Sequence, residues 1–141
     1  MSANSAKSIV KRYLEQIVNT GNVEHISEFI DSLYVDHNDS FAEIGVGVAA
    51  RHIRAVRSTF PDLLVTIEEQ IAEGDLVVTR CTARATHRGE WLGIPPTNRQ
   101  IVIPGINIDR VRNGKIVEHW GVADTLQALL AINALPLPKT W

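Results

Sequence analysis

Two runs rich in Ile and Val flank the dipeptide Asn113-Gly114, and this feature constrains the fold more than any other part of the sequence. Asn-Gly is the strongest short signal for a β-hairpin, because both residues tolerate the positive φ angles of a tight strand reversal. The sequence therefore predicts a hairpin over residues 105–124.

The two faces of this hairpin carry different side chains, because successive residues of a strand point to opposite sides of a sheet. One face carries Asn107, Asp109, Val111, Val117, His119 and Gly121. The other carries Ile106, Ile108, Arg110, Ile116, Glu118 and Trp120. A face that sets an amide, a carboxylate and an imidazole among aliphatic residues is typical of a cavity lining rather than of a core alone.

The rest of the chain reads as helices followed by strands. Apolar residues at helical spacing predict helices, and alternating runs predict strands. The expected helices are 5–19, 23–29, 47–60 and 125–132, the expected strands are 63–71, 76–87 and 100–103, and residues 34–40 read as a loop. Helices that precede an antiparallel sheet of about four strands indicate a segregated α+β fold, in which a curved sheet wraps on a helix and leaves an open cone.

Composition limits the class of protein. The 141 residues, 45% of them apolar, predict a single domain over residues 1–141. The 14 Lys and Arg residues nearly balance 16 Asp and Glu residues, so neither a nucleic acid nor a membrane is expected as a partner. The start of the chain lacks a signal-peptide pattern and no apolar run approaches the ~18 residues of a membrane span, so we expect a cytoplasmic protein.

The cysteine and histidine pattern argues against a metal centre. Cys81 is the single cysteine, which excludes an internal disulfide and a cysteine-rich metal site. The five histidines lack the short spacing of a zinc helix motif. We therefore expect no metal.

Two segments resemble a known family. His87–Thr97, which reads His-Arg-Gly-Glu-Trp-Leu-Gly-Ile-Pro-Pro-Thr, and Gly105–Trp120 are similar to motifs of the SnoaL-like polyketide cyclases, also called ester cyclases, and the similarity spans nearly the whole chain. The resemblance implies the cone-shaped α+β barrel that is shared with ketosteroid isomerases and nuclear transport factors. It also implies a homodimer formed through the outer sheet face, where Arg80, Ile108 and Trp120 would meet the partner.

The resemblance implies a reaction as well. Founding members of the family close a ring by intramolecular aldol condensation without metal or organic cofactor, with an aspartate as base and acid and a histidine that holds the enolate. In this chain the aspartate position falls on Gly121 and the histidine position on Asn107, while a shift of a few residues would bring Asp124 to the aspartate position. Because glycine cannot transfer a proton, the resemblance carries over to the fold more directly than to the reaction.

Four polar residues are candidates for catalysis: His119, Asp109, Asp124 and Asn107. An imidazole titrates near neutral pH, so we favour His119 with Asp124 or Asp109 as the acid–base pair, and Asn107 as the donor to an enolate or carbonyl oxygen. Structural roles remain open: His119 as a hydrogen-bonded core imidazole, Asp109 as the partner of an arginine, and Asp124 as the cap of the last helix.

Five further residues are candidates for contacting a substrate. They are His37 from the loop expected at the cavity mouth, Tyr34 and Trp91 as apolar walls, Cys81 on a strand face of small residues, and Gly121. Each of the aromatic residues and Cys81 could instead be ordinary core packing.

The favoured hypothesis is a cofactor-independent acid–base enzyme that acts on a small, largely apolar carbonyl compound, with polyketide ring closure as the best single guess. The alternatives are an isomerase, a hydrolase or a hydroxylase-type homologue, and a binding domain that has lost the catalytic aspartate at Gly121.

Overall fold

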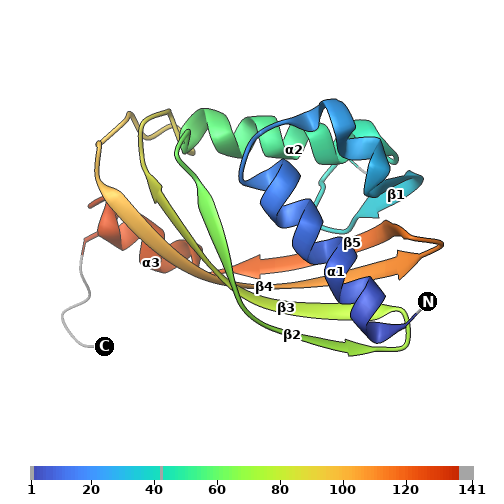
Figure 1. Cartoon of the computed structure of the whole chain (residues 1–141). Helices are drawn as coiled ribbons and strands as arrows, with labels where there is room; N and C mark the ends of the chain where they lie inside the picture. Colours follow the sequence, from blue (N-terminus) through green and yellow to red (C-terminus); the bar gives the residue numbers. More distant parts are fainter. Residues whose placement is uncertain (1, 42, 137–141) are drawn as a thin grey trace.

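The computed structural model describes residues 2–41 and 43–136. Helices pack on one side of a curved five-stranded sheet, so the expected α+β class is confirmed (Figure 1). The elements in chain order are α1 (Ala3–Tyr13), η1 (Leu14–Val18), η2 (Val23–Glu28), β1 (Ile30–Asp36), α2 (Val46–Thr59), β2 (Leu64–Glu73), β3 (Leu76–Thr86), β4 (Gln100–Arg112), β5 (Lys115–Ala123) and α3 (Thr125–Ala131).

The sheet is mixed, whereas an antiparallel sheet was expected. Its strand order is β1-β5-β4-β3-β2, and β1 runs parallel to β5 while the other pairs are antiparallel. Residues 34–36, expected in a loop, belong to β1 and pair with the stretch around His119. This pairing joins segments that lie far apart in the chain, so no local sequence pattern signals it.

The hairpin prediction is confirmed. Asn113 and Gly114 adopt φ angles of 51° and 79°, as the tight reversal requires. One face assignment was wrong: Arg110 pairs with Glu118 but Val111 pairs with Ile116, so Val117 is an unmatched extra residue. This bulge turns Ile116 into the core, where it is 1% exposed.

The helices differ in kind from the prediction. The expected helix over 5–19 is divided into the α-helix α1 and a π-helical turn, η1. The expected helix over 23–29 is the 3₁₀ helix η2, while α2 and α3 agree with the predicted ranges to within one residue at each end. None of the described helices is both long and apolar enough to cross a membrane.

Two hydrophobic clusters fill the space between the helices and the concave face of the sheet. The first joins α1, η1, η2 and α2 to the hairpin end of the sheet, through Val77, Val111 and Ile116. The second joins the opposite end of the sheet to α3, through Ala85, Ile101 and Ala128. The concave face between the clusters is the place where polar side chains of the sheet can gather.

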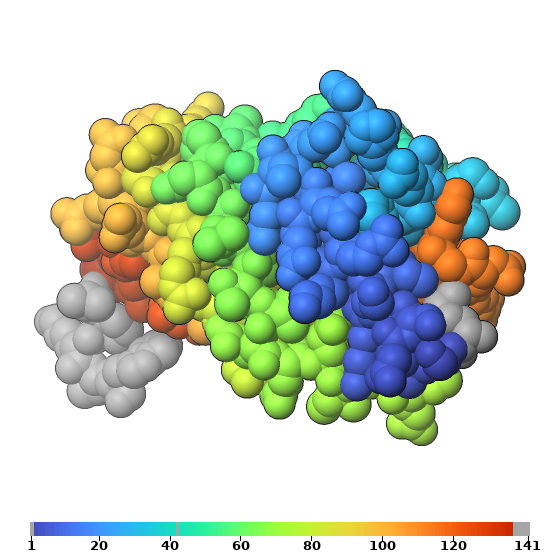
Figure 2. Space-filling view, in the orientation of Figure 1, coloured from blue at the N-terminus to red at the C-terminus, as the bar shows by residue number. Residues whose placement is uncertain are grey.

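Helix α1 and η1 lie directly against edge strand β2 (Figure 2). The side-chain amide of Asn19 fastens this contact, since Nδ2 donates to the Val65 carbonyl oxygen at 3.0 Å and Oδ1 accepts from the Val65 backbone amide at 2.7 Å. A surface hollow of about 460 Å³ runs along the same seam, lined by residues that include Lys11 and Gln70. The polar residues of the hairpin do not line this hollow.

We predict that Gly89→Ala strongly destabilises the fold. A Cβ atom at Gly89 would lie 2.1 Å from the backbone carbonyl oxygen of Ser58. Because backbone atoms cannot move aside cheaply, we expect a loss of about 1–3 kcal/mol, seen as a lower midpoint of thermal unfolding. The control is Gly47→Ala in α2, where a Cβ meets nothing within 4 Å and should stabilise the helix by roughly 0.5–1 kcal/mol. Equal midpoints for the two variants would contradict the prediction.

Candidate functional site

Strand register brings the polar residues of three strands together on the concave face. Asp36 of β1, His119 of β5 and Asp109 of β4 stand side by side across the sheet. In the next row toward α3, Gly121 of β5 pairs with Asn107 of β4. These residues lie between the two hydrophobic clusters, and His119, Gly121 and Asn107 remain partly accessible.

His119 and Asp109 form a hydrogen-bonded pair. The imidazole Nδ1 lies 2.7 Å from Asp109 Oδ1, and Asp109 is 5% exposed. Burial by itself lowers the pKa of His119, but the hydrogen bond from Nδ1 and the charges of Asp109 and Asp36 outweigh it, so the net pKa is raised above 6.5. Among the described residues Nε2 makes no hydrogen bond. The pair therefore has the arrangement of a general base whose second nitrogen is free for a ligand.

The absence of a side chain at Gly121 leaves room for the imidazole of His119. A Cβ atom at Gly121 would lie 3.0 Å from His119 Nε2 and 2.9 Å from Asn107 Oδ1. Both distances are shorter than contacts that a Cβ atom normally makes, so a side chain at this position would displace the imidazole and the amide. His119 Nε2 therefore occupies the space that a side chain at position 121 would need.

Asn38 holds the backbone of Gly121 in place. Its side-chain Nδ2 donates to the Gly121 carbonyl oxygen at 2.8 Å, and its Oδ1 accepts from the Gly121 backbone amide at 2.7 Å. This contact continues the β1–β5 pairing two residues beyond Asp36 and His119, with a side chain in place of a backbone. Sequence reasoning missed this role, because an Asn in a polar stretch carries no signal for its partner.

The side-chain amide of Asn107 points toward Cys81 of the neighbouring strand β3. Nδ2 lies 3.9 Å from Cys81 Sγ, and that thiol contacts the Gly105 carbonyl oxygen at 3.6 Å. Burial, followed by the charges of Asp109 and Glu68, raises the pKa of the Cys81 thiol. Cys81 is therefore a wall of the site rather than a thiolate nucleophile.

Two further titratable residues, Asp36 and Tyr13, belong to this cluster, and the sequence prediction did not include them. Asp36 is 7% exposed, and its charge contributes to the raised pKa of His119. Burial, followed by the charges of Asp109 and Asp36, raises the pKa of Tyr13. Tyr34 and Asp36 are two residues apart, so they share one face if residues 34–36 form a strand. The sequence analysis expected a loop there and therefore missed this signal.

Tyr34, a candidate wall for a substrate, lies in the hydrophobic core. It is 4% exposed, and burial is the main cause of its raised pKa, followed by the charges of Tyr13, Asp36 and Asp109. The tyrosine therefore stays protonated and borders the polar cluster with its hydroxyl group.

Two of the candidate residues, Asp124 and Trp91, lie elsewhere. Asp124 caps α3, where its side chain accepts from the Gln127 backbone amide at 3.0 Å. Trp91 packs in the second hydrophobic cluster, with its ring centre 5.5 Å from that of Phe60. Neither side chain joins the His119 cluster.

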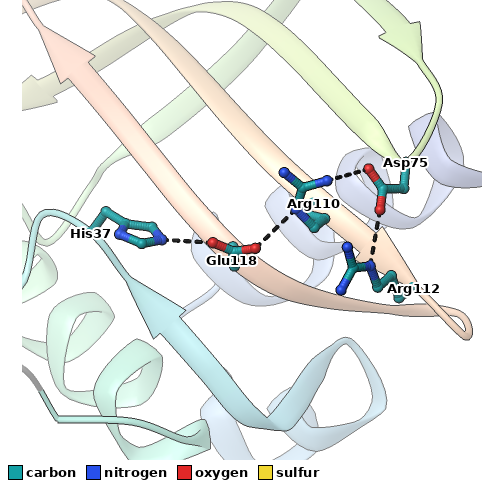
Figure 3. A network of polar contacts seen from close by, with 5 residues as sticks. All are labelled: His37, Asp75, Arg110, Arg112 and Glu118. Atoms are coloured by element: carbon teal, nitrogen blue, oxygen red, sulfur yellow. Dashed lines mark hydrogen bonds and ion pairs between the residues drawn. The ribbon is translucent and has the colours of Figure 1, made fainter.

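The side chain of His37 lies on the outer face of the sheet. Its Nε2 is 2.8 Å from Glu118 Oε2, and its ring stacks on Trp120 with 4.4 Å between ring centres. Figure 3 shows how Glu118 continues this contact to Arg110 and from there to Asp75 and Arg112. His37 therefore faces away from the cluster around His119.

The side chains of the cluster are of the types that acid–base chemistry uses. Among residues 2–41 and 43–136, no group of three or more His, Cys, Asp or Glu side chains is arranged to hold a metal ion. A paired imidazole can take up and return a proton, and the N–H groups of an amide can donate hydrogen bonds to a carbonyl oxygen.

This chain is similar in sequence and fold to several known proteins. Nogalonic acid methyl ester cyclase of Streptomyces nogalater is 29% identical over 106 residues, which cover 72% of this chain and 78% of that protein. The structure of TsrD from Streptomyces laurentii superposes with a TM-score of 0.86 at 27% identity and covers 96% of this chain and 99% of its own. AclR, a putative hydroxylase from Streptomyces galilaeus, gives a TM-score of 0.84 at 27% identity, over 98% and 87%.

The family model for SnoaL-like polyketide cyclases matches residues 8–132, nearly the whole length of the chain. The sheet architecture, the concave polar cluster and this match lead to one conclusion: the chain belongs to the SnoaL-like polyketide cyclase family.

Proposed function

We propose that this protein is an acid–base enzyme that closes a ring in a small, largely apolar carbonyl compound and needs no cofactor. The observation that carries the proposal is the His119–Asp109 pair, whose Nε2 makes no hydrogen bond to another described residue and lies beside the Asn107 amide at Gly121. Family membership supports a cyclase, and the compound in the name of the Streptomyces nogalater relative supplies a first substrate to test.

The proposed reaction is an intramolecular aldol condensation. Neutral His119 takes a proton from the carbon next to a carbonyl group, and the buried Asp109 carboxylate stabilises the imidazolium that forms. The resulting enolate carbon attacks a second carbonyl carbon of the same molecule, and a carbon–carbon bond forms. The imidazolium then returns its proton to the new alkoxide, so protons and charge balance.

Asn107 is proposed to hold the enolate oxygen. Its Nδ2 makes only the long 3.9 Å contact to Cys81 Sγ, so a ligand oxygen can compete for this donor easily. The oxygen would then lie toward Gly105 and Cys81, and the reacting carbon toward His119 Nε2. An amide donor placed where negative charge develops lowers the barrier to enolate formation.

We predict that His119→Gln lowers the turnover of nogalonic acid methyl ester by about 10²–10⁴-fold, because general base catalysis contributes a factor of that size. Loss of the open-ring chromophore, followed by absorbance and mass spectrometry, measures the rate. The control is His25→Gln in η2, whose imidazole is 61% exposed and outside the cluster. If wild type and His119→Gln turn over at the same rate, the proposed base is wrong.

The pH dependence follows from the raised pKa of His119. Because the neutral imidazole is the base, kcat/KM should fall as the pH drops through that pKa, with a midpoint above 6.5. In Asp109→Asn the hydrogen-bonded charge is gone and burial remains, so the pKa of His119 should fall. An NMR titration of the imidazole signals measures both proteins without substrate. An unchanged midpoint in Asp109→Asn would show that the pair does not control the base.

We also propose a homodimer formed through the outer face of the sheet. Ile106 and Val122 pair on this face and are 49% and 79% exposed. Ile71 of β2 and Val102 of β4 extend the exposed apolar surface. Water contact over such a surface is unfavourable, and a second copy of the same face would cover it with matching apolar side chains.

For the dimer we predict that Val122→Asp shifts the mass measured by light scattering from two chains to one. A charge buried at the centre of an apolar interface lacks a partner and opposes association. Leu92→Asp, at an equally exposed position in the connection after β3, is the control and should leave the mass unchanged. A wild-type protein that has the mass of one chain at micromolar concentration would overturn this proposal.

A further inference from the structure

His87 is a fully buried histidine, and one of its ring nitrogens has no partner. It directly follows β3, is 0% exposed, and has its ring centre 6.1 Å from that of Phe60 and 6.3 Å from that of Trp91 in the second hydrophobic cluster. Among residues 2–41 and 43–136, His87 Nε2 is one of two buried side-chain nitrogen or oxygen atoms that make no hydrogen bond. Because burial of a polar group without a partner is costly, this nitrogen is a candidate for contacting a ligand.

The other ring nitrogen shows which kind of hydrogen bond Nε2 can make. Nδ1 lies 3.3 Å from the Thr97 backbone nitrogen and 3.0 Å from Thr97 Oγ1. A backbone N–H can only donate, so Nδ1 is the acceptor and the ring proton is on Nε2. Nε2 is therefore a hydrogen-bond donor among apolar and aromatic side chains. The ligand group that matches it is an acceptor carried by an apolar molecule, such as the oxygen of a ketone.

A ligand can reach this buried donor only if a neighbouring segment moves. Residues 91–96 belong to the connection between β3 and β4, which lies beside the C-terminal end of α2 (Figure 1). Among residues 43–136, the backbone of 91–96 hydrogen-bonds only within this segment. Just before it the chain is fastened, since the Arg88 and Gly89 amides donate to the Thr59 carbonyl oxygen at 3.1 and 2.9 Å. The segment can therefore swing outward with Trp91 while the bonds that hold its start remain intact.

We propose that His87, Phe60 and Trp91 form a binding site for a small apolar ketone. The ketone oxygen accepts a hydrogen bond from His87 Nε2, which gives the buried donor its missing partner. The ring of the ketone takes the place of the Trp91 ring against Phe60, where the two side chains now have 5.5 Å between ring centres. The displaced segment 91–96 then packs over the ligand from outside. The site is thus closed in the free protein and opened by the ligand.

This site is separate from the cluster around His119. Asn107 of that cluster pairs with Thr79 on β3, and His87 follows eight residues later in the chain. Eight residues of strand span roughly 26 Å along the chain, which is much longer than a bicyclic ketone. The inference therefore does not rest on the proposed function, and each can hold without the other.

The test compares 1-indanone with indane, which has the same rings without the oxygen. Each compound is titrated into the full chain, and the NMR signal of the Trp91 indole N–H, assigned with Trp91→Phe, gives the dissociation constants. We expect His87→Asn to weaken the binding of 1-indanone at least tenfold and that of indane less than threefold. The reason is that the asparagine Oδ1 can replace Nδ1 as the acceptor at Thr97, whereas the Nε2 donor is lost.

His87→Gln is the matched variant. Its amide nitrogen reaches the position of the imidazole Nε2 and can donate there, whereas the acceptor at Thr97 is lost. This variant should bind 1-indanone within about threefold of the wild type. His119→Gln, which alters the other cluster, should leave the dissociation constant read at Trp91 unchanged. Circular dichroism checks that each variant keeps its fold.

Three outcomes overturn the inference. The first is 1-indanone leaving the Trp91 signal unchanged in the wild type. The second is His87→Asn binding both compounds as the wild type does, or weakening both equally, because His87 then only fills space and its N–H faces an aromatic ring. The third is loss of the Trp91 response in His119→Gln, which would assign the ketone to the cluster around His119.

Discussion

The antiparallel pairing of β4 with β5 is the constraint on which the site depends. It sets Asp109 opposite His119 and Asn107 opposite Gly121, and all four residues face the helices. A slip of one residue would turn every one of these side chains to the outer face. The two hydrophobic clusters resist such a slip, because Val111 and Ile116 at one end and Ile101 at the other are buried through the same register.

Strand β1, the second partner of β5, adds residues to the site that the β4–β5 hairpin does not contain. Parallel pairing with β1 brings Asp36 next to His119, and the amide of Asn38 then fixes the backbone at Gly121. His119 is thereby placed between two buried carboxylates, one hydrogen-bonded and one close enough to act through its charge. Their combined effect outweighs the desolvation of the imidazole, which explains how this partly buried histidine can still bind a proton.

Gly121 stands where the family resemblance implies a catalytic aspartate. A glycine where relatives of this fold are expected to carry a catalytic side chain suggests lost activity when the sequence is taken alone. In the structure, His119 Nε2 and Asn107 Oδ1 occupy the space that a side chain at position 121 would fill. In this account the catalytic base is His119, two residues before Gly121 on the same face of β5, and no base is needed at position 121.

Sequence reasoning located the hairpin, the polar face and the pairing candidates His119 and Asp109, because strand alternation and an Asn-Gly turn are local signals. It missed Asp36, whose strand has its partner some eighty residues away, and it placed Ile116 on the wrong face because a bulge leaves no mark in the sequence. His37 was assigned to the cavity for a related reason: once 34–36 is a strand, its side chain must alternate to the outer face. Local patterns gave the elements, and long-range pairing decided which residues meet.

The most direct measurement of the central claim is the turnover of nogalonic acid methyl ester by the wild type and by Gly121→Asp, compared at the same pH. If the glycine makes room for the His119–Asp109 base, the new side chain collides with Nε2 and with Asn107, and turnover should fall at least tenfold. If the glycine marks a lost catalyst, the new aspartate restores the missing base, and the variant should be as fast as the wild type or faster. That second result would contradict the account.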